Sequence, residues 1–158
     1  MMTHFKNHLD LLQFFTIFFN SDRLRPLSYP GANVIIICIS VVDPKPFENV
    51  RTRWLPEVTH HCPHVPIVLA ATKTDLREDQ ASLKLLQQRN CKPVTSQEIE
   101  QFAKEIKAFS FQECSSKLNS GIKELFEKCM QAVLFPNEGK EGSKKQEDSK
   151  KKKDCLMM

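Results

Sequence analysis

The stretch VIIICISVV at residues 34–42 is a nearly unbroken run of apolar residues, most of them β-branched. Gly31 precedes it, and Asp43 and Pro44 follow it. A short apolar run between turn-forming residues is typical of a strand that is buried on both faces, as in a parallel sheet. This stretch is therefore predicted to be a central strand of the sheet.

Shorter apolar runs at residues 66–71 and 109–114 predict two further strands. Thr95 is the expected N-cap of one of the intervening helices, with Glu98 completing a capping box. Helices are expected at residues 47–59, 80–89, 95–107 and 121–135. The alternation of strands and helices predicts an α/β fold of three layers with a mainly parallel sheet and right-handed crossovers.

Residues 1–21 are atypical, because they hold five of the eleven phenylalanines of the 158-residue chain. The apolar positions 11, 14, 15 and 18 fit a helix. The Phe, Ile and Thr content of residues 14–19 fits a strand equally well. The sequence leaves both structures open for this segment.

The net charge of +4 is unevenly distributed, because residues 140–154 hold seven lysines and four acidic residues. A nucleic-acid-binding domain is expected to carry its basic patch on the folded body, so no nucleic-acid partner is predicted. A basic tail instead favours an anionic membrane surface. Residues 137–158 are expected to be disordered. The apolar stretches are too short for a membrane-spanning helix, and the chain is expected not to be secreted.

The six cysteines are widely spaced and form no C-x-x-C pair, so neither a zinc site nor a disulfide scaffold is predicted. They are Cys38, Cys62, Cys91, Cys114, Cys129 and Cys155. The string His60-His61-Cys62 with His64 contains metal-ligand types, but adjacent ligands beside a proline suit tetrahedral coordination poorly. No metal site is predicted.

Polar loops follow the second and third predicted strands, at the edge where ligands of parallel sheets bind. Thr72-Lys73-Thr74-Asp75 fits a loop that recognises guanine. Asp75 can accept from N1–H and the 2-amino group, and the alkyl stem of Lys73 can cover one face of the base. An ordinary polar turn between a strand and a helix is an alternative interpretation of these four residues.

The loop after the third predicted strand strengthens the prediction of a guanine site, because it would supply a second set of contacts to the same base. It reads Ser115-Ser116-Lys117. The backbone N–H of Ser116 can donate to O6 of guanine, and Lys117 can cover the base edge or the ribose.

The chain ends in Cys155-Leu156-Met157-Met158, a C-a-a-X box whose final methionine favours a farnesyl group. One lipid chain anchors a protein only marginally and needs a polybasic partner. The lysines at positions 150–153 (Lys150, Lys151, Lys152 and Lys153) supply it. Lipidation of Cys155 is therefore predicted.

Six short stretches between residues 22 and 77 carry a specific family resemblance. They are DRLRPLSYP (22–30), FENVR (47–51), Trp54, PEV (56–58), HHCP (60–63) and TKTDLR (72–77). Together they resemble the Rho family of small GTPases, nearest the Rac subgroup, and residues 78–94 resemble that family's insert helix. The resemblance extends from about residue 22 to residue 158.

This resemblance implies a partial Ras-like (P-loop NTPase) fold over residues 22–136, followed by the polybasic tail. It implies GTP/GDP binding with Mg²⁺, signal transduction and control of the actin cytoskeleton. Exchange factors and a dissociation inhibitor would be partners, and the chain would lie in the cytoplasm and on the cytoplasmic face of the plasma membrane. By position, the guanine-binding residues are Thr72, Lys73, Asp75, Ser115, Ser116 and Lys117.

The phosphate-binding motifs of that family are missing from these 158 residues. None of the four glycines begins a G-x-x-x-x-G-K-[ST] motif, and none completes a D-x-x-G loop. The effector loop and the N-terminal strands are missing too. No catalytic residue is therefore predicted, the Mg²⁺ ligands are missing, and GTP binding is expected to be weak or absent.

Three functional hypotheses remain open. The chain is a truncated Rho/Rac-type GTPase, a nucleotide-independent prenylated module that competes for Rho regulators, or a non-functional fragment from an incorrect gene model.

A bare edge on the 34–42 strand would favour aggregation. By the resemblance, this strand normally pairs with the P-loop strand. From their Phe and Ile content, we hypothesise that Leu11 to Phe19 replace that strand.

Overall fold

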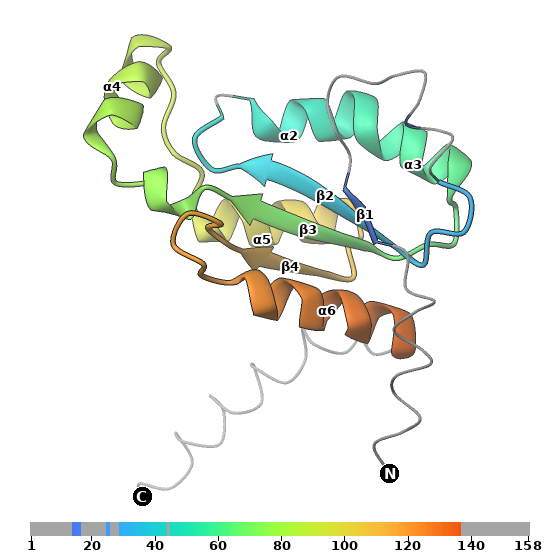
Figure 1. The fold of residues 1–158 in the computed structure, drawn as a ribbon. Coiled ribbons are helices and arrows are strands. Elements are labelled where there is room, and N and C mark those ends of the chain that lie inside the picture. Colours follow the sequence, from blue (N-terminus) through green and yellow to red (C-terminus); the bar gives the residue numbers. More distant parts are fainter. Residues whose placement is uncertain (1–13, 17–24, 26–28, 44, 137–158) are drawn as a thin grey trace, which may run out of the picture.

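A computed structural model describes residues 14–16, 25, 29–43 and 45–136 (Figure 1). Its sheet has four parallel strands in the order β1-β2-β3-β4. They are β1 (Phe14–Thr16), β2 (Val34–Ser40), β3 (Ile67–Thr72) and β4 (Ser110–Glu113). The three strands expected from the apolar runs are confirmed as β2, β3 and β4.

β1 is a fourth strand, and it resolves the ambiguity of the phenylalanine-rich segment where that segment is described. Phe14 pairs with Val34 and Thr16 with Ile36, in parallel register. The segment thus covers part of the edge of β2, as hypothesised, and the strand interpretation is correct for residues 14–16. The remainder of residues 1–21 lies outside the described residues.

The helix expected at residues 47–59 is a continuous helical segment with a π-turn in its middle. It consists of α2 (Pro46–Asn49), η2 (Val50–Trp54) and α3 (Leu55–His61). Pro56 has no N–H to donate and its ring crowds the preceding turn. The segment widens into the π-turn just before this proline, and the Leu55 N–H bonds to the carbonyl of Val50.

The remaining helices match the expected positions closely. Thr95 accepts a bond from the Glu98 N–H, and the Glu98 carboxylate accepts one from the Thr95 N–H, which confirms the capping box. The helices are α4 (Gln80–Gln88), α5 (Ser96–Glu105) and α6 (Ile122–Leu134), with a short 3-10 turn, η3 (Thr74–Leu76).

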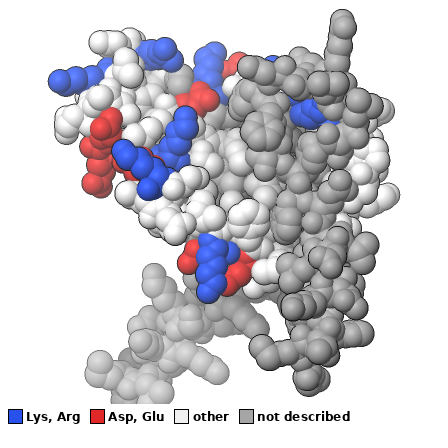
Figure 2. All heavy atoms as spheres, in the orientation of Figure 1, with Lys and Arg blue, Asp and Glu red and all other residues white. Residues whose placement is uncertain are grey.

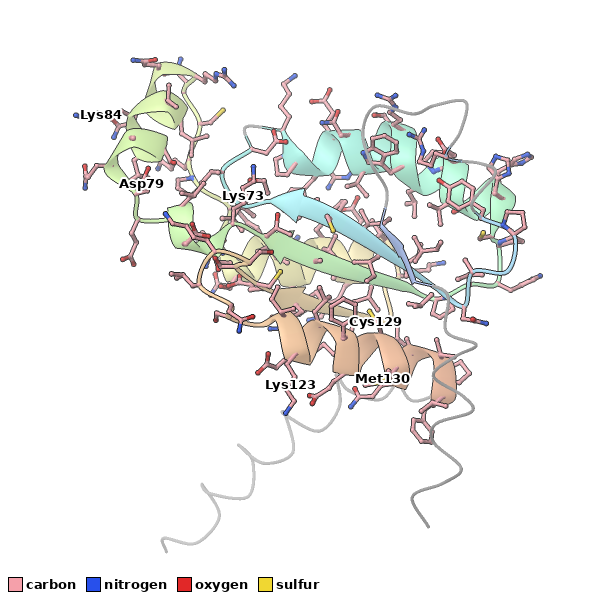
Figure 3. The ribbon with its side chains drawn as sticks, viewed as in Figure 1. Lys73, Asp79, Lys84, Lys123, Cys129 and Met130 are labelled. Atoms are coloured by element: carbon pink, nitrogen blue, oxygen red, sulfur yellow. The ribbon has the colours of Figure 1, made fainter. Side chains whose placement is uncertain are left out.

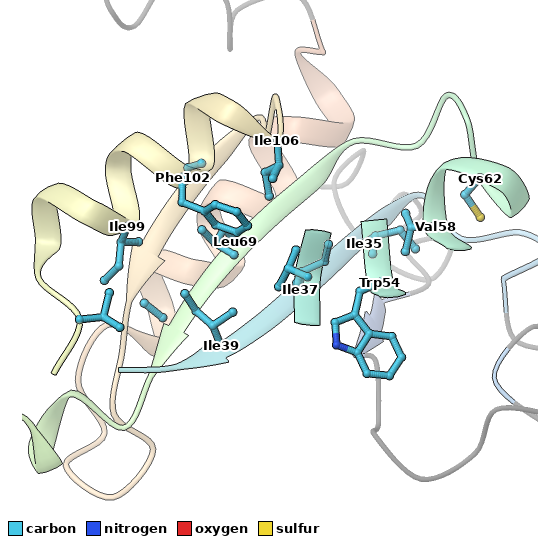
Figure 4. Close-up of a cluster of buried hydrophobic side chains, with 14 of the residues drawn as sticks. Ile35, Ile37, Ile39, Trp54, Val58, Cys62, Leu69, Ile99, Phe102 and Ile106 are labelled. Carbon is cyan, nitrogen blue, oxygen red and sulfur yellow. The ribbon is translucent and has the colours of Figure 1, made fainter. Parts of the chain in front are cut away.

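Alternate side chains of the central strands enter two separate cores. Ile35, Ile37 and Ile39 pack against α2–α3 and α5, together with Trp54 and Phe102 (Figure 4). The neighbouring residues of β2 and β3 pack against α6 on the opposite face. The fold is therefore three-layered, with helices on both faces of the sheet (Figure 1).

A partly buried ion pair attaches the residues before β2 to α3. Arg25 is 5% exposed and donates two hydrogen bonds of 2.6 Å to Glu57. The guanidinium lies 4.5 Å from the centre of the Trp54 ring, and the Tyr29 hydroxyl donates to Glu57 at 2.6 Å. Hydrogen bonding from Arg25 holds the pKa of Glu57 below its ordinary value. Burial and the neighbouring Glu57 raise the pKa of Tyr29.

Within the described ranges, no helix is both long and apolar enough to cross a membrane. The predicted tail at residues 137–158, which includes Cys155 and the lysines at 150–153, lies outside the described residues.

Replacing Ile37 with alanine should destabilise the fold, because this side chain is 1% exposed in the larger core. Removing three carbons there should cost about 2–5 kcal/mol of the free energy of unfolding. Leu85→Ala is the matched control, since Leu85 is 59% exposed on α4 and its loss should change stability by no more than about 0.5 kcal/mol. Urea denaturation measures both, and equal losses would contradict the assigned core.

Candidate functional site

Polar residues gather where β3 and β4 end, at one edge of the sheet. Thr72 closes β3, and its hydroxyl donates to the carbonyl of Ile39 at 2.9 Å, so this side chain supports the sheet. Lys73 follows in the left-handed backbone region, with φ at 60°. This conformation turns the chain so that the Thr74 N–H donates to the Cys114 carbonyl at 3.3 Å. Lys73 itself is exposed at the carboxyl ends of the strands (Figure 3).

A short hydrogen bond joins the two predicted guanine-binding loops. The Ser115 hydroxyl donates to Oδ1 of Asp75 at 2.5 Å and accepts from the Leu118 N–H at 3.2 Å. Ser115 is fully buried. An ionised carboxylate has acceptor capacity on both oxygens, so Asp75 can take further donors from a ligand.

The second loop is a tight turn closed at its base. Ser115 and Ser120 exchange backbone hydrogen bonds of 2.9 and 3.0 Å, which leaves Ser116 and Lys117 exposed at the turn. Gly121 follows with φ at 71°, and a Cβ there would lie 2.1 Å from the Glu113 carbonyl oxygen. Only glycine fits this position, because the close approach and the positive φ exclude a side chain.

Charges of both signs lie at the α4 end of the molecule, next to these loops (Figure 2). Asp79 caps α4 by accepting from the Ser82 N–H at 2.8 Å. Hydrogen bonds from Ser82 lower the pKa of Asp79, and the charge of Lys117 lowers it further.

A second, half-buried ion pair links the same two loops. Arg77 donates to both carboxylate oxygens of Glu113, at 3.0 and 2.9 Å. Sequence reasoning missed this pair, because the two residues are 36 positions apart and the TKTDLR stretch that contains Arg77 gives no sign of its partner. Hydrogen bonding from Arg77 lowers the pKa of Glu113, although burial opposes the shift.

A cavity of about 240 Å³ lies beside the first loop, between the ends of β2 and β3 and the segment α2–η2. Lys73, Asp43 and Asn49 are among the residues that line it. In the described part of the chain, no three His, Cys, Asp or Glu side chains are placed to hold a metal ion.

The two loops carry the polar groups predicted for a guanine base. Asp75 and the Ser116 N–H match the donors and acceptor of guanine in chemical type. The lysine and glycines of a P-loop are missing from the sequence. The structure thus brings Lys73, Asp75 and Ser115 together, presents Ser116 and Lys117 beside them, and turns Thr72 inward. Their recognition of guanine stays a prediction.

Comparison with protein families identifies a matching family. A model of the Ras family matches residues 20–135, which includes both loops and the sheet from β2 onward.

Glu113→Gln should lower stability at neutral pH and matter less in acid. Since the folded-state pKa lies below the ordinary value of 4.5, the carboxylate contributes stability above that pH. The contribution is lost as the pH falls through the folded-state pKa. Urea midpoints of wild type and variant should therefore converge as the pH falls below 4.5.

Glu48→Gln is the control for this titration, because Glu48 is an exposed residue of α2. It should track the wild type at every pH. A constant difference in urea midpoint between Glu113→Gln and wild type across the pH range would contradict the prediction. It would show that the stability contributed by Glu113 does not depend on its charge.

Proposed function

The chain belongs to the Ras family, and from this premise we propose that it is a small GTPase of the Rho/Rac subgroup that recognises the guanine base through two connected loops. The observation that carries the proposal is the 2.5 Å hydrogen bond from Ser115 to Asp75, which places both loops at one site. Its role would be signal transduction and regulation of the actin cytoskeleton.

The proposed selectivity follows from the donors and acceptors of the two purines. Guanine offers two donors to the Asp75 carboxylate, from N1–H and the 2-amino group. Adenine offers an acceptor at N1 and no 2-amino group, so the carboxylate would be left without partners. Unpaired polar groups of this kind produce steep discrimination.

Two features support the Rho/Rac subgroup. The segment at residues 78–94 contains α4, a helix between the first loop and α5, where the resemblance expects an insert helix. The DRLRPLSYP stretch contributes Arg25 and Tyr29 to the network on Glu57. Both features lie in segments of the sequence that resemble the Rho family, residues 78–94 and 22–30.

We also propose that these 158 residues bind guanine nucleotides weakly and do not hydrolyse GTP. In P-loop NTPases the phosphate cradle, its lysine and Mg²⁺ supply positioning and charge neutralisation. Base contacts alone support a Kd of about 1 mM, or about −4 kcal/mol. Saturation of a fluorescent GTP analogue at sub-micromolar concentration would contradict this part of the proposal.

Asp75→Asn should change base preference. Asparagine keeps an oxygen for the Ser115 hydroxyl but replaces one acceptor by a donor. GMP binding should weaken by about tenfold, the effect of losing one hydrogen bond to a charged group. Binding of XMP, which carries a carbonyl oxygen in place of the 2-amino group, should strengthen. NMR titration of the Ser116 and Lys117 amides measures both.

Glu48→Gln makes the same chemical change away from the loops and should leave the preference for GMP unchanged. AMP should produce no shift at these amides in any variant. A wild-type chain that shows no response to GMP would refute base recognition and favour the second candidate, the nucleotide-independent prenylated module that competes for Rho regulators. Its binding to a Rho dissociation inhibitor would not change with added nucleotide.

Prenylation of Cys155, with the lysines at 150–153, is proposed to hold the chain at the cytoplasmic face of the plasma membrane. Cys155→Ser should abolish incorporation of a prenyl analogue and move the protein to the soluble fraction of cells. Replacing the four lysines by glutamine should leave incorporation intact but reduce membrane association, because one lipid chain binds only marginally. Cys91→Ser, outside the motif, should behave as wild type.

A further inference from the structure

Arg77 directly follows η3, and Glu113 is the last residue of β4. Arg77 lies two residues after Asp75, and Glu113 lies two residues before Ser115. Their forked ion pair, with bonds of 3.0 and 2.9 Å, therefore joins the same two segments of the chain as the Asp75–Ser115 hydrogen bond. The two side chains are 28% and 25% exposed, which shields the pair partly from solvent.

Arg77 makes a third contact that the other residues of the loops do not duplicate. Its Nε–H donates to the Val94 carbonyl at 3.2 Å, and the Val94 N–H donates to the Val41 carbonyl at 2.8 Å. Residues 78–93, which contain α4, leave the body at Arg77 and return at Val94. The Arg77 guanidinium thus bonds both to Val94, where this segment ends, and to Glu113, just before the second loop.

Reading one base with two loops requires a fixed separation between Asp75 and the Ser116 N–H. Besides the Arg77–Glu113 pair, the bonds between the loops include the Ser115 hydroxyl contact with Asp75 and the 3.3 Å bond from the Thr74 N–H to the Cys114 carbonyl. The Ser115 hydroxyl bonds to Asp75, which is itself the residue proposed to contact the base. The bond from Thr74 to Cys114 is long. A rigid brace beside them would keep the separation constant before a ligand arrives.

We propose that Arg77 is the positioning residue of the guanine site, which sets the separation of the two loops and couples the segment at residues 78–93 to base recognition. This inference rests on the proposed function of the loops. The planar guanidinium makes all three bonds at once. Lysine retains the charge but cannot form the fork and reach Val94 together.

Arg77→Lys tests the proposal with two readouts on the full chain. The Kd for GMP should rise by about tenfold, the effect of losing one hydrogen bond to a charged group. The ratio of the IMP to the GMP dissociation constants should fall, because IMP lacks the 2-amino group that a correctly placed Asp75 recognises. A residue that only supports the fold would change stability and leave this ratio unaltered.

Hydrogen exchange without ligand supplies the second readout. The amides of Thr74 and Leu118, which bond to Cys114 and Ser115, should exchange faster in Arg77→Lys. The Ile35 amide, bonded to Pro66 in the core, should be unchanged. Arg51→Lys is the matched control, since Arg51 makes a similar fork with Glu105 away from the loops. It should alter neither readout.

The two readouts separate failure of the inference from failure of the proposed function. If wild type binds GMP and Arg77→Lys binds it with the same affinity and the same ratio, the positioning role is overturned. If wild type does not bind GMP, base recognition is refuted. Unchanged exchange at Thr74 and Leu118 in Arg77→Lys would then overturn the brace as well, and faster exchange would establish it as a link between the loops.

Discussion

β2 has no face toward solvent, because Ile35 and Ile37 pack under α2–α3 and α5 while Val34 and Ile36 pack under α6. A strand of this kind requires helices on both sides of the sheet. Helices that connect neighbouring strands by crossovers make those strands parallel. The carboxyl ends of β2, β3 and β4 consequently lie at one edge, and the loops that follow β3 and β4 meet there.

The loops at that edge adopt conformations that the sheet alone would not stabilise. Lys73 has a positive φ, and Gly121 is pressed against the Glu113 carbonyl. Hydrogen bonds join the two loops in these conformations, since the Thr74 N–H donates to the Cys114 carbonyl and the Ser115 hydroxyl donates to Asp75. The geometry of the candidate site therefore depends on both loops together.

Local patterns in the sequence were sufficient for most of the architecture. The apolar run at 34–42 and the Thr95–Glu98 capping box act over a few residues, so their structural meaning can be read directly. The polar loops after β3 and β4 could be placed at one edge because parallel strands share their carboxyl ends. Recognition of guanine by those loops stays a prediction.

Features that depend on distant partners could not be predicted. The Arg25–Glu57 and Arg77–Glu113 pairs join residues 32 and 36 positions apart, and a charged residue gives no local sign of its partner. The strand at Phe14–Thr16 depended on the open edge of β2, since its own residues fit a helix as well. The π-turn at Val50–Trp54 arises from an interaction of Pro56 with the preceding turn, which apolar periodicity does not register.

The loops proposed for the base are physically separate from the place of a phosphate-binding loop in a P-loop NTPase. They follow β3 and β4 and are joined by the Asp75–Ser115 and Arg77–Glu113 contacts. None of these bonds uses a residue before Thr74. The geometry of these two loops therefore rests on contacts among the described residues themselves. In P-loop NTPases, positioning and charge neutralisation come from the phosphate contacts, and this separation is the basis of our proposal that the 158 residues bind nucleotide weakly.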